Sequence, residues 1–132
     1  MGAHTADCIV EAWGPDRVSC LAEAVRALVE VFAAVDGVPV ARSVPVSLPP
    51  GPDDQMLVAL LEEVLFVVDA FGEVPVGVHL EPTAEGGVTG VMDVAPSCSV
   101  TLVGPVPKAV SYHQLQIQEI GGEWRCRAIV DV

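Results

Sequence analysis

Basic residues are scarce in this chain: 6 lysines and arginines stand against 18 aspartates and glutamates, a formal net charge of −12 over 132 residues. Affinity for nucleic acids comes largely from Lys and Arg side chains that displace counterions from phosphates, so we expect no direct binding of RNA or DNA. Such a charge suits the binding of cations or docking onto a basic protein surface. A merely solvated acidic surface is an equally open interpretation.

Long hydrophobic runs are also missing, although 52% of the residues are hydrophobic. No run approaches the roughly 20 residues needed to cross a bilayer, and the N-terminus lacks the basic and apolar regions of a signal peptide. We therefore expect no membrane association. The length and composition are those of one domain, over residues 1–132.

The four cysteines are widely scattered, without the C-x-x-C spacing of zinc knuckles and redox motifs. Most lie among aliphatic residues, as Cys8 does, so we expect reduced and mostly buried thiols in a cytoplasmic protein. The sequence also lacks a Gly-rich phosphate loop, a G-x-S-x-G elbow, an H-E-x-x-H pair and a Rossmann fingerprint. These absences favour a protein that is not an enzyme.

Hydrophobic periodicity predicts two helices. The first is expected to have Ser19 as its N-terminal cap and to end near Asp36. The second is expected to run from Asp53 to about Asp69, with apolar residues along one side.

Short runs rich in β-branched residues, separated by proline and glycine, predict strands. Residues 8–13 form the first strand, and the proline-interrupted segment 38–48 should lie at a sheet edge. Gly121 and Gly122 are typical of a hairpin between the last two strands. This order predicts an α+β fold, a two-layer sandwich in which both helices pack on one face of a mainly antiparallel sheet. The other strands are expected at 74–80, 88–94, 99–103, 110–119 and 124–132.

Three carboxylates stand at the predicted ends of the first and last strands. Asp7 precedes the first strand, and Asp131 is followed only by Val132 and its terminal carboxylate. If these strands are antiparallel neighbours, the three groups converge and repel one another unless a cation lies between them. An all-oxygen cluster suits Ca²⁺ or Mg²⁺ better than zinc. The plainer alternative stays open: Asp7 caps a turn and Asp131 is a solvated residue near a chain end.

A second concentration of polar residues lies at 107–113, where Lys108 is the only lysine of the chain. Strand alternation places His113 on the same face as Leu115 and Ile117, in line with core residues. We therefore expect His113 to be a hydrogen-bonded structural group rather than a ligand or a base.

The last predicted strand alternates two arginines with apolar residues. Arg125 and Arg127 fall on the face that also carries Asp131. They are placed to anchor carboxylates within the protein or on a partner, because a guanidinium binds a carboxylate through two parallel hydrogen bonds.

Three segments of the chain, taken in order, resemble the signature segments of the archease family. They are His-Thr-Ala-Asp at 4–7, Lys-Ala-Val-Ser-Tyr-His at 108–113 and Ile-Val-Asp-Val at 129–132, with the acidic helix segment 61–65 between them. The resemblance implies an α+β protein cofactor, not an enzyme. Its partner would be an RtcB-type RNA ligase, which uses GTP, and manganese in its own site, in tRNA splicing and RNA repair. The cofactor would promote guanylylation of the ligase and keep it turning over.

The same resemblance implies a metal site. Its ligands would be Asp7, Asp131 and the terminal carboxylate of Val132, and its usual metal would be calcium, with magnesium or manganese as alternatives. Four other polar residues of the signature segments are candidates for partner binding or for support of the site: His4, Lys108, Tyr112 and His113.

Two other functions stay open. In a small metal-dependent hydrolase, the same carboxylates would activate water with His4 or His113 as the base. A general chaperone-like binding protein would instead need an exposed apolar patch. An enzyme needs a concave site that buries its substrate, whereas an activator can present a metal on an exposed edge.

Overall fold

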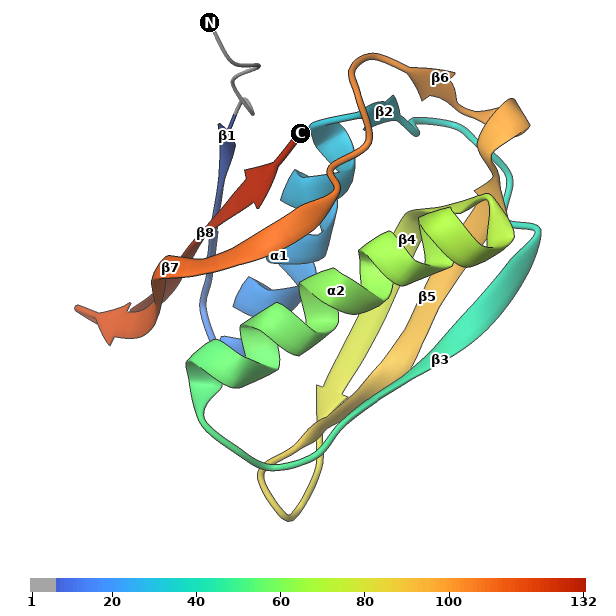
Figure 1. The fold of residues 1–132 in the computed structure, drawn as a ribbon. Coiled ribbons are helices and arrows are strands. Elements are labelled where there is room, and N and C mark those ends of the chain that lie inside the picture. Colours follow the sequence, from blue (N-terminus) through green and yellow to red (C-terminus); the bar gives the residue numbers. More distant parts are fainter. Residues whose placement is uncertain (1–6) are drawn as a thin grey trace, which may run out of the picture.

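The computed structural model describes residues 7–132 and contains two three-stranded antiparallel sheets with two helices between them (Figure 1). One sheet has the strand order β1-β8-β7 and the other β3-β5-β4. A short pair, β2 with β6, completes the fold. The elements are β1 (Asp7–Gly14), α1 (Arg17–Glu30), β2 (Ala33–Ala34), β3 (Arg42–Leu48), α2 (Asp53–Phe71), β4 (Glu73–Pro82), β5 (Val88–Pro96), the 3-10 helix η1 (Ser97–Ser99), β6 (Thr101–Leu102), β7 (Ala109–Ile120) and β8 (Glu123–Asp131).

The predicted α+β class, with two helices and antiparallel strands, is confirmed. The difference is that the strands are divided between two sheets, where the sequence suggested one sheet covered on one face. The first helix shows why: α1 contacts β1 and β8 on one side and β4 on the other. Its exposed residues are only Glu23, Arg26 and Glu30, which form one narrow stripe at spacings of three and four. The rest of its surface needs cover from both sheets.

The start and end of α1 differ from the prediction. Asp16, not Ser19, is the cap, and its carboxylate accepts a hydrogen bond of 2.8 Å from the backbone N–H of Ser19. The helix ends at Glu30 because the chain then tightens into a turn, in which the N–H of Phe32 bonds to the carbonyl of Val29. The second helix matches its prediction, and Gly72, with φ of +63°, closes it in the left-handed conformation.

Most predicted strands are present. The proline-interrupted segment forms β3, which is an edge strand as expected, and Gly121 and Gly122 join β7 to β8 with positive φ values. The segment predicted as a strand at 99–103 contains the end of η1 and the two residues of β6. Among residues 7–132, neither helix is long and apolar enough to span a membrane.

His113 does not lie in line with the core, so this prediction is wrong. The β7–β8 register shifts between Ser111 and Gln116, and Gln114 has a φ of +59°. Such a bulge breaks the alternation of a strand. His113 is therefore exposed, whereas Leu115 and Ile117 beyond the bulge still pack against the core.

The hydrophobic core lies between the two sheets and is built around the helices. Its largest fully buried side chains include Phe32, Leu28, Leu57 and Met92. The four cysteines are free: two are buried, Cys8 is half-buried and Cys98 is exposed. This core fixes both sheets against the same pair of helices, and the antiparallel pairing of β1 with β8 places the end of β8 beside the start of β1.

Candidate metal centre at the edge of the β1-β8-β7 sheet

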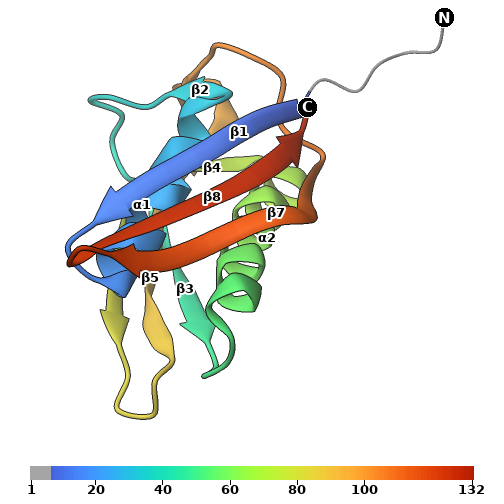
Figure 2. The same cartoon turned by 90° about the vertical axis from the view of Figure 1, so that its left-hand side faces the viewer.

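Asp7 and Asp131 are directly opposite each other in the antiparallel register of β1 and β8. Residues opposite each other in adjacent strands point to the same face, about 5 Å apart at Cβ. In β1 the alternate residues Cys8, Val10 and Ala12 face the helices, so both aspartates lie on the outer face. Figure 2 shows this sheet in front of the helices, with the start of β1 beside the end of β8. The predicted convergence of these two carboxyls is thus found in the structure.

The two carboxyl groups interact closely. A hydrogen bond between the carboxyls of Asp7 and Asp131 raises the pKa of Asp7, and loss of hydration and the negative charge of Asp131 raise it further. A proton bound between the two carboxylates relieves their repulsion, but few protons are available at neutral pH. A cation between the two groups relieves it in the same way.

Val132 follows this pair, and its side chain packs against the core. If Val132 ends the chain, its terminal carboxylate supplies a third oxygen group near Asp131. Within the described residues, His, Cys, Asp and Glu side chains form no group of three or more that could hold a metal ion. If Val132 is the C-terminal residue, the donors at this edge are two side-chain carboxylates and the main-chain end, a set of hard oxygens that fits Ca²⁺, Mg²⁺ or Mn²⁺.

Lys108 lies on the β7 side of Asp131, whereas Asp7 lies on its β1 side. Its backbone N–H donates a hydrogen bond of 2.6 Å to the carbonyl oxygen of Asp131, and Ala109 is the β7 residue opposite Asp131. The side chain of Lys108 is exposed. The segment that contains the only lysine therefore starts at the same sheet edge as the aspartate pair. His4 lies outside the described residues.

Tyr112 and His113 lie farther along β7, in the bulge, and both are exposed. The hydroxyl of Tyr112 donates a hydrogen bond of 3.2 Å to Glu62 of α2, and this bond raises the pKa of the tyrosine. The backbone N–H of His113 bonds to the Ser111 hydroxyl. Tyr112 and His113 thus lie along β7 away from the aspartates and do not form one cluster with them.

A groove between α2 and β7 was not predicted from the sequence. It has a volume of about 640 Å³ and is lined by Glu62, Phe66 and Asp69 of the helix and by residues 106–110. Lys108 belongs to both this groove and the aspartate edge. The acidic segment of α2 was noted in the sequence, but its spatial relation to Lys108 depends on the packing of α2 against β7, which no local pattern reveals.

The chain resembles known proteins along its whole length. A family described as the Archease protein family (MTH1598/TM1083) matches residues 1–132. A protein of Mycobacterium tuberculosis named "Probable protein archease" is 37% identical over 129 residues, which cover 98% of this chain and 72% of that protein. "Protein archease" of Pyrobaculum neutrophilum is 26% identical over 136 residues, covering 99% of this chain and 92% of its own.

Two solved structures have a similar fold. The solution structure of Methanobacterium thermoautotrophicum protein 1598 matches with a TM-score of 0.76 and 24% identity, covering 99% of this chain and 96% of that one. The crystal structure of a Thermotoga maritima archease, described as a possible chaperone, matches with a TM-score of 0.70 and 18% identity. It covers 98% of this chain and 93% of the other.

Proposed function

The chain belongs to the archease family, and from this we propose that it is a protein cofactor that activates a GTP-dependent tRNA-splicing RNA ligase. In this proposal it speeds guanylylation of the ligase and keeps it turning over. The partner of an acidic protein of net charge −12 is expected to offer a basic surface. The mouth of an active site that binds GTP and RNA is such a surface.

The observation that carries the proposal is the pairing of Asp7 with Asp131 at an exposed sheet edge. Asp7 is exposed and Asp131 is half-buried. Two carboxylates that face each other on the surface can be presented to a partner without any cleft having to open. Their mutual repulsion also means that a cation or a basic partner group at this edge stabilises the chain.

A divalent cation, calcium first and magnesium or manganese as alternatives, would be held by Asp7, Asp131 and the terminal carboxylate of Val132. When bound, it would supply positive charge next to the phosphates of GTP in the ligase. The task of the chain is to hold the two aspartates in register and to keep them exposed. The hydrogen bond from Lys108 to the main chain of Asp131 fixes the end of β8 for this purpose.

Two alternatives use the same residues differently. A metal-dependent hydrolase would need a base beside the carboxylates. His113 lies in the β7 bulge, beyond Lys108 and Ala109, and the other candidate base, His4, lies outside the described residues. A general chaperone-like binding protein, in line with the description of the Thermotoga maritima structure, would use exposed hydrophobic residues. The exposed side chains of Phe66 and Phe71, whose rings pack edge to face, offer a small patch of that kind.

Single-turnover guanylylation of the cognate ligase tests the proposal. The ligase is mixed with radiolabelled GTP with and without this chain, and label on the ligase is followed over time. Faster transfer in the presence of the chain is expected. An unchanged rate, with a ligase that guanylylates on its own, would refute the proposal, and heat-denatured chain serves as the control for added protein.

A further inference from the structure

The outer face of the β1-β8-β7 sheet carries a second feature, separate from the aspartate edge. Most arginines of the described residues are paired with carboxylates: Arg17 with Asp53, Arg26 with Glu23, Arg42 with Glu73 and Arg125 with Glu123. Arg127 has no carboxylate within 4 Å in the described part of the chain, although Glu11 is its register partner on β1. In so acidic a protein, an arginine without a carboxylate is unexpected.

Arg127 also lacks a hydrogen-bond partner at one of its nitrogens. Its Nε is buried and has no hydrogen-bond partner among residues 7–132. Buried donors are nearly always hydrogen-bonded in native proteins, because an unsatisfied donor has lost its water and gained nothing in exchange. The Arg125 guanidinium, two residues away on the same face, has one exposed carboxylate contact within residues 7–132, at 3.4 Å from Glu123.

Around these arginines lies a small hollow of about 120 Å³, lined among others by Trp13, Gln116, Gln118 and Glu11. It has room for about four water molecules at the roughly 30 Å³ that each occupies in the liquid. The two guanidinium groups and the two amides can donate hydrogen bonds, whereas Glu11 is the one carboxylate. A carboxylate is therefore the group that this hollow fits.

Apolar side chains flank the hollow. Ile9, Trp13 and Ile120 are about half exposed, at 53%, 47% and 50%, and all three come from the strands of this sheet. Figure 2 shows this face unobstructed by the helices or by the other sheet. In a small protein, exposed apolar residues beside an unsatisfied cation are typical of a protein-protein contact, which has apolar residues and arginine at its centre.

We propose that this arginine face, formed by Ile9, Trp13, Ile120, Arg125 and Arg127, docks a partner segment in which acidic side chains alternate with apolar ones. A carboxylate of the segment enters the hollow and accepts hydrogen bonds from Arg127, whose side chain turns to offer Nε together with a terminal nitrogen. The apolar side chains cover Trp13 and its neighbours. The surface is distinct from the aspartate edge, because Arg127 lies four residues, or about 13 Å, along β8 from Asp131.

The charge around the hollow favours an acidic peptide over a nucleic acid as the ligand. A nucleic acid spans more of the surface than the hollow and so also meets the surrounding acidic residues of a chain of net charge −12, which two arginines do not offset. A short acidic peptide instead senses the local field, because charges beyond the Debye length of about 8 Å are screened at physiological salt. Within that range two guanidinium groups stand against Glu11 and Glu123, so the local charge at the hollow is balanced rather than negative.

The two tryptophans allow a sharp test. Trp13 lies on the arginine face, whereas Trp124 is half-buried and packs against the core. The ¹⁵N-labelled chain is titrated at 0.15 M salt with a synthetic peptide of alternating glutamate and isoleucine, and the two indole N–H signals are followed by NMR. We expect a saturable shift of the Trp13 signal with little change at Trp124. A matched peptide with glutamine in place of glutamate should bind with an affinity at least about tenfold lower.

Variants locate the site. Arg127→Gln should lower the affinity for the glutamate peptide at least about tenfold. Arg26→Gln removes the same charge from α1 and should leave this affinity unchanged. The Trp124 signal reports whether each variant is folded. Equal binding of glutamate and glutamine peptides, or tighter binding of a lysine peptide, would overturn the proposal. So would a Trp13 shift that saturates when the concentration of the chain alone is raised, because a second copy would then occupy the face.

Discussion

Asp7 and Asp131 face each other across the β1–β8 pair, and the interaction of their carboxyl groups raises the pKa of Asp7. Two carboxylates in this position destabilise the fold when both are ionised. Removing one charge should therefore stabilise the chain in the absence of metal. We expect the Asp7→Asn variant to have a higher Tm than the wild type in EDTA at pH 7, measured by differential scanning fluorimetry.

Addition of calcium should reverse this order. Ca²⁺ at about 100 times its Kd would stabilise the wild type by about 2.7 kcal/mol, on the order of 10 °C in Tm for a chain of this size. Asp7→Asn and Asp131→Asn should lose most of this gain. Asp36→Asn, which removes an exposed carboxylate from the loop after β2, is the matched control and should keep it. An equal calcium response in all four proteins would count against the metal site.

Gly90 is required where β5 passes β4. A Cβ built on this residue would lie 1.9 Å from the carbonyl oxygen of His79, and neither backbone can move without breaking the strand pair. Gly90→Ala should therefore destabilise the chain by about 3 kcal/mol or more. Gly51→Ala is the control, since a Cβ there meets nothing within 4 Å. Urea unfolding followed by circular dichroism compares the two, and a stable Gly90→Ala would contradict the packing of β4 against β5.

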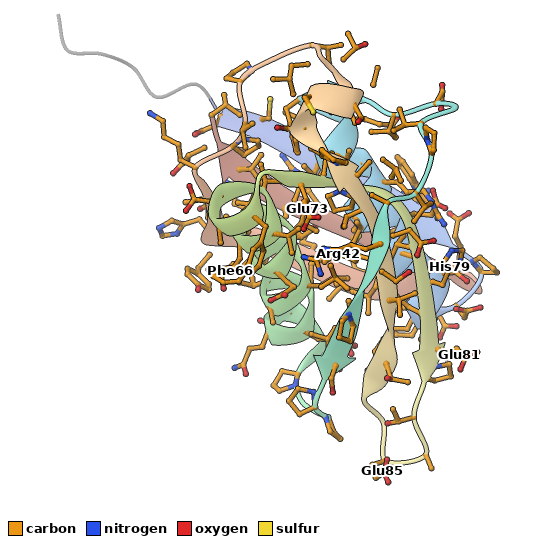
Figure 3. All side chains as sticks on the ribbon, turned by 90° about the vertical axis from the view of Figure 1, so that its right-hand side faces the viewer. Arg42, Phe66, Glu73, His79, Glu81 and Glu85 are labelled. Atoms are coloured by element: carbon orange, nitrogen blue, oxygen red, sulfur yellow. The ribbon has the colours of Figure 1, made fainter. Side chains whose placement is uncertain are left out.

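Arg42 on β3 and Glu73 at the start of β4 lie side by side in Figure 3 and form a forked ion pair, with distances of 2.8 Å from Nε and 2.5 Å from Nη2. The hydrogen bonds from Arg42 lower the pKa of Glu73. The pair therefore adds stability above the unfolded-state pKa of about 4.3, and this is lost as pH falls through the lower folded-state value. Arg42→Gln should be less stable than the wild type in urea at pH 7. The difference should shrink near pH 2 to what the contact of the Arg42 guanidinium with the Phe71 ring contributes, and a constant difference would rule out the ion pair as its cause.

Two phenylalanines test the position of the core. Phe32 is fully buried after α1, whereas Phe66 on α2 is 54% exposed. Phe32→Ala should cost about 3–5 kcal/mol, because it removes a large side chain from close-packed surroundings. Phe66→Ala should cost about 1 kcal/mol or less, mainly the edge-to-face contact with Phe71. Similar losses from both variants in chemical unfolding would mean that the helices are not placed between the sheets as described.

The sequence predicted the helices and most strands because local rules govern them. Asp53 begins α2 as expected, and Gly121 with Gly122 turns the last hairpin. The meeting of Asp7 and Asp131 was predictable as well, since it needs only that the first and last strands pair in antiparallel register. Each of these features depends on neighbours in sequence or on one strand pairing.

Features that depend on several elements at once were not predictable. The exposure of His113 follows from a bulge in β7, which interrupts the alternation used to place it. The division into two sheets follows from how β3, β5 and β4 pair away from β8. The groove beside Lys108 and the unsatisfied Nε of Arg127 arise from packing between elements. No pattern within one segment carries that information.

The most direct test of the central claim is single-turnover guanylylation of the cognate ligase with the edge variants. Wild type and Asp36→Asn should accelerate label transfer from GTP equally, whereas Asp131→Asn should lose at least about 90% of the acceleration while remaining folded, as expected for a group that acts on the reacting partner. Full acceleration by Asp131→Asn would contradict the claim that this chain acts through its paired aspartates.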